Sequence, residues 1–197
     1  MEISAGQVKE LREKTGAGMM DCKKALTDAK GNVEEAVKLL RERGIAKAAS
    51  KAGRDTSEGI ICSYIHPGDK LGVLLEVACE TDFVARTEKF RQFTRDVAMQ
   101  IAASSPLCVR REDIDPNLIA QEREIYRTQA RNEGKPDKIL DKIVDGKIEK
   151  YFAEVVLTEQ PFVKDNDKTI GDYLKETIGT LGENIQIKRF SRFRLGE

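Results

Sequence analysis

The chain has 197 residues, of which 40% are hydrophobic, so it can bury a core and is not a disordered chain. Lysine plus arginine equals aspartate plus glutamate at 34 each, and the resulting net charge of zero excludes a global field that favours nucleic acid or an anionic membrane. Any charged contact with a partner must therefore come from a local patch.

The cysteines are widely spaced and form no C-x-x-C pair, so we expect reduced, buried thiols; they are Cys22, Cys62, Cys79 and Cys108. The N-terminus lacks the basic-then-apolar order of a signal peptide. No apolar run approaches the roughly 20 residues that span a bilayer. These features predict a soluble, cytoplasmic protein without a membrane segment.

Residues 1–45 are predicted to form a module of three short helices. Ser4 and Gln7 have the spacing of a capping box, so the first helix is expected to begin at Ser4. Asn32 begins the third helix in the same way, and Gly44, a favourable left-handed cap residue, is expected to end it. A core of this size supplies little stability, so the module is expected to depend on close helix packing.

A small, basic linker at residues 46–57, helical in part, is expected to lead into a core domain at residues 58–197. Two strands, at residues 60–65 and 71–79, are predicted to form a hairpin. Pro67 followed by a glycine at the centre of the connection suits a type II turn, since proline fixes one φ and glycine permits a positive one.

Three helices are expected after this hairpin, the first of them a long helix to about Ala103. Asp115 followed by a proline predicts the start of the second, which is expected to end near Gly134. Residues 136–157 carry a helical stripe of apolar side chains that is broken only by Gly146, and this stripe predicts the third helix.

A short helix at residues 169–178 and a strand at residues 183–194 are predicted to end the chain. The apolar alternation of this strand loses phase at Phe190 and Phe193, which indicates a bulge or contacts on both faces. The predicted fold class is α+β: a three-helix bundle, then a small, mainly antiparallel three-stranded sheet covered by helices.

The motifs of common enzyme classes are missing from the sequence. Neither G-x-x-x-x-G-K-[ST] nor G-x-G-x-x-G occurs, which argues against nucleotide binding by this chain. The single histidine, His66, lies at a turn, so no histidine-rich metal site and no cysteine–histidine nucleophile is indicated. We therefore expect a protein that is not an enzyme and that binds no metal or cofactor.

Two other features are candidates for binding a partner. Residues 188–194 interleave basic and aromatic side chains, as on a strand on which nucleic-acid bases stack, although a solvated, partly packed strand is the simpler interpretation. Met19 and Met20 lie about 100° apart on a helix, so at least one is expected to be exposed, where a thioether suits a contact surface.

The stretch from Thr81 to Val84 follows an apolar strand and opens a helical segment. Asp82 suits the first turn of a helix, where it faces the positive end of the helix dipole. Periodicity alone aligns Phe83 with Phe90 and predicts that it is buried. Its position at the rim of the sheet instead allows the ring to project.

Two long motifs in this chain closely resemble bacterial translation elongation factor Ts. They are LREKTGAGMMDCKKAL at residues 11–26 and EVACETDFVAR at residues 76–86, and LTEQPF at 157–162 and GENI at 182–185 also look like family sequence. The resemblance covers nearly the whole chain and implies an N-terminal bundle of the ubiquitin-associated type.

The resemblance implies a guanine nucleotide exchange factor for elongation factor Tu. Asp82 and Phe83, flanked by Thr81 and Val84, would act as a wedge that disturbs the magnesium and phosphate groups of the partner, while this chain binds neither magnesium nor GDP. The N-terminal module and linker would add contacts through Arg12, Met19, Met20, Lys23 and Lys51.

Longer family members carry a second half of the core and a coiled-coil excursion, for which this chain leaves no room. Short members are thought to pair two copies, so we expect a homodimer, which would also cover an edge of the small sheet. The alternatives are an RNA-binding, ribosome-associated protein that uses the C-terminal strand and a ubiquitin-like or peptide adaptor that uses only the bundle. We expect no direct contact with nucleic acid or membrane.

Overall fold

The computed structural model describes residues 3–197, so residues 1–2 of the predicted N-terminal module lie outside it. The chain divides into two compact units. The first comprises the chain up to Ile61 with Glu76–Thr94 and Asp172–Gln186, and the second comprises Cys62–Leu75, Arg95–Gly171 and Ile187–Glu197.

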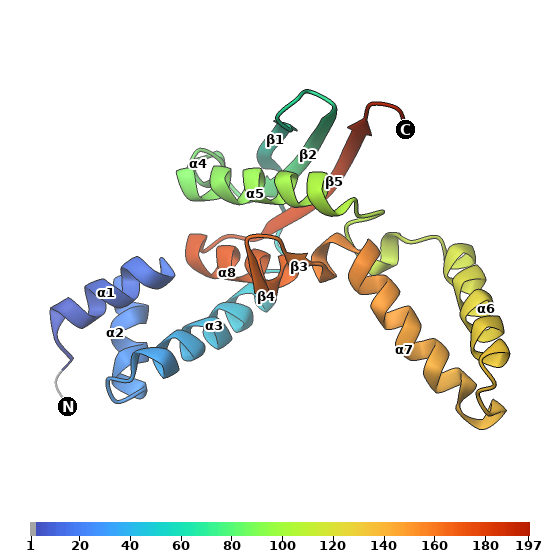
Figure 1. Ribbon diagram of the computed structural model, residues 1–197. Helices are drawn as coiled ribbons and strands as arrows, with labels where there is room; N and C mark the ends of the chain where they lie inside the picture. The colour runs from blue at the N-terminus through green and yellow to red at the C-terminus, as the bar shows by residue number, and fades with distance from the viewer. Residues whose placement is uncertain (1–2) are drawn as a thin grey trace. The chain divides into compact units, whose positions relative to one another are not determined.

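Three helices open the first unit: α1 (Ala5–Thr15), α2 (Met19–Asp28) and α3 (Val33–Ala49) (Figure 1). The predicted capping box is confirmed, since Gln7 N donates to Ser4 Oγ at 3.2 Å and Ser4 N donates to Gln7 Oε1 at 3.0 Å. The three helices share a small core that consists of Val8, Leu11, Cys22, Ala25, Leu26, Ala29 and Ala36.

The predicted end of the third helix at Gly44 is wrong, because α3 continues to Ala49 and takes up the start of the expected linker. The residues that follow Gly44 are rich in alanine, which favours the helix enough to carry it through a glycine. A Cβ added to Gly179 would meet the Cα of Gly44 at 2.9 Å. The backbones of Gly44 and Gly179 therefore approach each other closely, and a side chain at Gly179 would obstruct this approach, whereas a Cβ at Gly44 would meet nothing within 4 Å.

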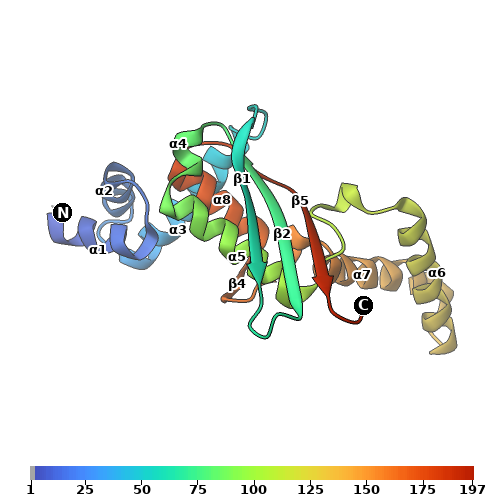
Figure 2. The same ribbon diagram turned by 90° about the horizontal axis from the view of Figure 1, so that it is seen from above.

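The sheet has three antiparallel strands in the order β1–β2–β5: β1 (Glu58–Ile65), β2 (Leu71–Cys79) and β5 (Ile185–Arg194) (Figure 2). The turn between β1 and β2 is confirmed, since Asp69 N donates to His66 O at 3.0 Å and Gly68 has φ +96°. The predicted α+β fold class is confirmed.

The long helix predicted after the hairpin is divided into α4 (Asp82–Ala85) and α5 (Glu88–Ser104). Thr87 makes the division, because its hydroxyl donates to Val84 O at 2.8 Å and accepts from Phe90 N at 3.2 Å. The hydroxyl thus closes one helix and caps the next. The buried side chains of α5 follow the predicted stripe and include Phe90, Phe93, Val97 and Ile101.

In the second unit, α6 (Pro116–Asn132) and α7 (Asp137–Val155) lie side by side as a helical hairpin (Figure 1). Ion pairs between the helices join Arg127 to Asp141 at 2.9 Å and Arg123 to Asp145 at 2.5 Å. The expectation that the chain has no room for a paired helical excursion is therefore wrong.

The remaining elements are the short helices η1 (Arg111–Asp113) and η2 (Leu157–Glu159), the strands β3 (Pro161–Phe162) and β4 (Asp165–Thr169), and α8 (Ile170–Leu181). The β3–β4 pair was not predicted, because β3 has two residues and β4 is polar throughout, so neither carries an apolar alternation. Among residues 3–197, no helix combines the length and apolar character needed to cross a membrane.

Candidate partner-binding site

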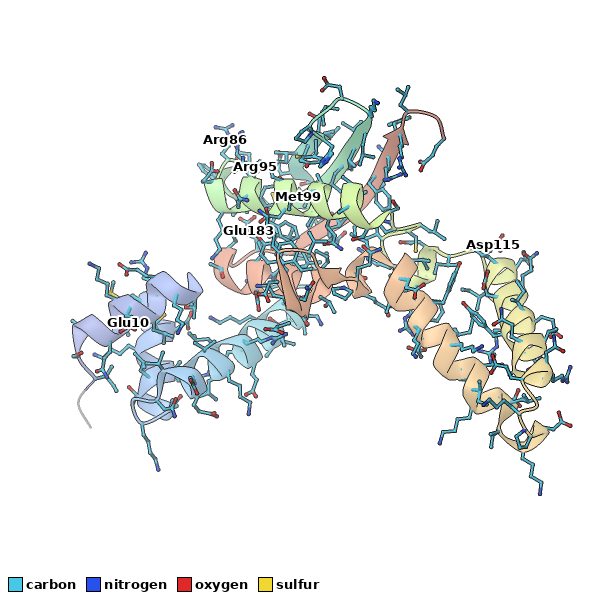
Figure 3. The ribbon with its side chains drawn as sticks, viewed as in Figure 1. Glu10, Arg86, Arg95, Met99, Asp115 and Glu183 are labelled. Carbon is cyan, nitrogen blue, oxygen red and sulfur yellow. The ribbon has the colours of Figure 1, made fainter. Side chains whose placement is uncertain are left out.

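The centre of the candidate site is the corner at which β2 ends and α4 begins. Thr81 has extended backbone, with φ −132° and ψ 154°, and caps α4 by accepting from Val84 N at 3.4 Å. Asp82, the first helical residue, pairs with Arg86 one turn later at 2.8 Å. Arg86 projects from the end of α4 (Figure 3). The first turn of α4 is thus fixed from both sides.

Phe83 is 79% exposed in this first turn, so the burial predicted from periodicity is wrong. The physical reason is the break at Thr87: α4 is a separate helix of four residues, and the buried stripe of α5 does not continue into it. Val84, beside it, is half-buried. The exposure of Phe83 agrees with the projecting ring that the resemblance implies.

The corner is held by two consecutive residues that follow α8. Glu183, labelled in Figure 3, accepts from Thr81 N at 3.0 Å and from Thr81 Oγ1 at 2.6 Å. Asn184 N donates to Glu80 Oε1 at 2.6 Å, and this bond holds the pKa of Glu80 below its ordinary value. Glu80, the residue after β2, and Thr81, the cap of α4, are therefore both held by the two residues that follow Gly182.

Asn184 also joins the corner to the expected linker. Its Nδ2 donates to Arg54 O at 2.8 Å and to Ala52 O at 3.4 Å, and the side chain is 2% exposed. Lys51 donates from Nζ to Gly182 O. The ammonium of Lys51, expected to contact a partner, thus already bonds within this chain.

The N-terminal module presents four of its predicted contact residues to solvent. Met19 is 53% and Met20 is 76% exposed, which confirms that at least one of them is exposed. Arg12 and Lys23 are exposed as well. Both methionines open α2, where Gly18 at the N-cap provides no side-chain bond.

Lys89 connects this module to the helix that follows the corner. Its ammonium donates to Gly16 O at 3.4 Å, and burial lowers the pKa of Lys89 below its ordinary value. Gly16 ends α1 in a left-handed conformation, with φ +65°. The loop before Met19 is thus tied to the first turn of α5.

The basic character of the C-terminal strand is partly neutralised. Arg192 and Arg194 pair with Glu197 at 3.0 and 3.4 Å, and Arg192 also donates to Ala102 O. Phe193 is 70% exposed. The exposed ring of Phe193 is therefore flanked by two arginines whose charge is partly balanced within the chain.

The thiols and carboxylates of the described residues form no group that could hold a metal ion. The four cysteines are free, and Cys22 and Cys79 are buried as expected. The expected burial of Cys62 and Cys108 is wrong, since both are partly exposed. Burial raises the pKa of Cys79 to about 11, and a second contribution comes from the charge of Glu183. A thiol of this kind is a poor nucleophile at neutral pH.

Comparison with known proteins agrees with these motifs. The family described as "Elongation factor TS" matches residues 1–197. The chain belongs to the elongation factor Ts family. The protein named elongation factor Ts from Geotalea uraniireducens is 57% identical over 197 residues, which is 100% of this chain and 91% of that relative.

A second relative, elongation factor Ts from Desulfosudis oleivorans, is 60% identical over 195 residues, or 99% of this chain and 98% of its own length. The likeness to elongation factor Ts therefore includes all the elements that form the corner. Glu183 and Asn184 were missed as site residues by sequence reasoning. The only signal was their place in the GENI stretch, which does not indicate what they contact.

Proposed function

We propose that this chain is a guanine nucleotide exchange factor that binds the GDP form of elongation factor Tu and speeds GDP release. It acts in the cytoplasm during translation elongation, by protein–protein contact and without a covalent step. The observation that carries the proposal is Phe83, 79% exposed at a capped and anchored corner in a member of the elongation factor Ts family.

The corner is suited to act as a wedge. Exposing a phenylalanine ring to water is unfavourable, and burying it in a partner recovers that free energy. Asp82 lies beside it and offers a carboxylate near groups that hold magnesium and phosphate in the partner. In this proposal the protein holds neither magnesium nor GDP and only disturbs the groups that do.

Exchange follows from linkage between two binding equilibria. A factor that binds the nucleotide-free partner more tightly than its GDP form lowers the GDP affinity by the same ratio. The ring supplies this difference if its site is open only in the rearranged partner. Arg12, Met19, Met20 and Lys23 add affinity from the N-terminal module, and Lys51 adds a linker contact if it leaves Gly182.

The decisive experiment measures release of a fluorescent GDP analogue from elongation factor Tu. The unaltered protein should accelerate release, and Phe83→Ala and Asp82→Ala should each lower the maximal rate by at least tenfold. Leu107→Ala is the matched control, because Leu107 is an apolar residue that is 60% exposed and lies outside the site. Absence of acceleration by the unaltered protein would refute the exchange function, whereas full activity of Phe83→Ala would refute only the wedge.

We also propose a homodimer formed through the exposed face of the sheet. A groove of about 490 Å³ lies there between the end of β1, the β1–β2 turn, β2 and the end of β5. Four exposed apolar side chains line it: Ile65, Leu74, Phe193 and Leu195. Contiguous apolar surface of this kind is typical of protein interfaces. Light scattering at micromolar concentration should give twice the chain mass, and a monomer mass would refute the dimer.

The RNA-binding alternative relies on Phe193, whose exposed ring could stack on a base. RNA affinity should fall steeply with salt, whereas exchange depends on Phe83. Titration of ribosomal RNA fragments at two salt concentrations therefore separates the two functions.

A further inference from the structure

We propose that Glu183 is a positioning residue that holds the β2–α4 corner in the conformation that presents Phe83. This inference rests on the proposed exchange function, since Phe83 is its wedge. Glu183 does not belong to the wedge itself. It acts through Thr81, the residue that caps α4.

The need for such a residue follows from the length of α4. A helix of four residues has too few internal hydrogen bonds to be stable alone, because nucleation fixes several residues for each bond gained. Its direction therefore depends on its cap. Thr81 Oγ1 accepts from Val84 N, and Thr81 O accepts from Ala85 N at 3.2 Å. The orientation of Thr81 thus sets the orientation of Phe83.

Glu183 fixes Thr81 through both groups that Thr81 can donate. Its Oε2 accepts from the backbone N–H at 3.0 Å, and its Oε1 accepts from the hydroxyl at 2.6 Å. Bonds to a carboxylate are shorter and stronger than neutral ones, and two bonds to one residue also fix its rotation. The hydroxyl hydrogen points to Glu183, which leaves the lone pairs of Oγ1 for Val84 N.

Glu183 is itself held on both sides along the chain. Before it, Gly182 has φ +80° and its carbonyl accepts from Lys51. After it, Asn184 is nearly fully buried and bonds to Glu80 and to the backbone of Arg54. The carboxylate thus stands on a rigid support, as a positioning group requires.

Loss of the two bonds from Thr81 to Glu183 should weaken the affinity for elongation factor Tu and leave the maximal exchange rate unchanged. A partner that needs one conformation binds more weakly in proportion to the fraction of molecules that adopt it. Removing two charge-assisted bonds should reduce that fraction on the order of tenfold. Glu183→Ala should therefore raise the concentration for half-maximal exchange about tenfold and preserve the maximal rate. Phe83→Ala should instead lower the maximal rate.

A second measurement reports on the mobility of the β2–α4 corner in the isolated protein, without elongation factor Tu. Amide hydrogen exchange of Val84 and Ala85 should be faster in Glu183→Ala than in the unaltered chain. The sequence contains no tryptophan, so Phe83→Trp adds a single tryptophan that can be excited apart from the four tyrosines, and its anisotropy should fall when Glu183→Ala is combined with it. Glu133→Ala, which removes an exposed glutamate after α6, is the matched control and should change neither reading.

Glu183→Gln keeps an acceptor for one of the two donors and should give intermediate values for both readings. If Glu183→Ala fails to fold, as judged by circular dichroism, this variant carries the test. Unchanged amide exchange at Val84 together with an unchanged half-maximal concentration would overturn the proposal. Faster amide exchange over the whole first unit would also overturn the proposal, because it would indicate a general structural role for Glu183. If the unaltered protein fails to accelerate GDP release, the exchange function falls, and faster amide exchange still supports the control of the corner by Glu183.

Discussion

Phe83 in α4 and Phe90 in α5 have opposite environments. Phe83 is 79% exposed, whereas Phe90 is fully buried in α5. We predict that Phe83→Ala changes the free energy of unfolding by no more than about 0.5 kcal/mol. Phe90→Ala should lower it by about 3–5 kcal/mol, because it removes a buried ring and leaves a cavity. Urea unfolding of both variants checks this, and a large loss in Phe83→Ala would show that its ring packs within the chain.

Cys79 makes the stability of the fold sensitive to alkaline pH. In the folded chain its pKa is raised from 9.0 to about 11, mainly by burial. Between these values the unfolded chain releases the thiol proton and the folded chain keeps it, so the free energy of unfolding should fall as pH rises from about 9 to 11. Urea unfolding under reducing conditions should show a shallower decline in Cys79→Ala, and equal slopes would contradict the prediction.

Two glycines on helices allow opposite predictions for the same substitution. Alanine is favoured over glycine inside a helix by about 1 kcal/mol. Gly146 in α7 has open space around an added Cβ, so Gly146→Ala should raise the free energy of unfolding by about 0.5–1 kcal/mol. Gly179→Ala in α8 should lower it instead, because the Cβ would lie 2.9 Å from the Cα of Gly44. Thermal unfolding of the pair decides this, and stabilisation by both would show that α3 and α8 separate readily.

Elements with a clear local signal were predictable, and those set by distant contacts were not. The capping box at Ser4 and the turn at Gly68 need only neighbouring residues, and both are confirmed. The close approach of Gly179 in α8 to Gly44 in α3 joins positions more than a hundred residues apart and has no local signal. At the candidate site, the bonds of Glu183 to Thr81 likewise join residues that no periodicity connects.

At the scale of the whole molecule, the proposed homodimer makes stability depend on concentration. A dimer that dissociates on unfolding has a Tm that rises with protein concentration. We predict such a rise for the unaltered chain and its loss in Phe193→Glu, which places a charge on the apolar groove. Calorimetry at two concentrations tests this, and a concentration-independent Tm in the unaltered chain would exclude the dimer.

The bonds that Asn184 makes to the linker also determine where proteases can cut the chain. Lysines and arginines make this segment a series of potential trypsin sites. Cleavage after Arg54 requires its carbonyl to enter the protease, but Asn184 Nδ2 holds that oxygen at 2.8 Å. Arg54 N in turn donates to Lys51 O at 2.9 Å, so the backbone before the scissile bond is folded into a turn. The basic linker should therefore resist trypsin cleavage at Arg54 for as long as the corner is intact.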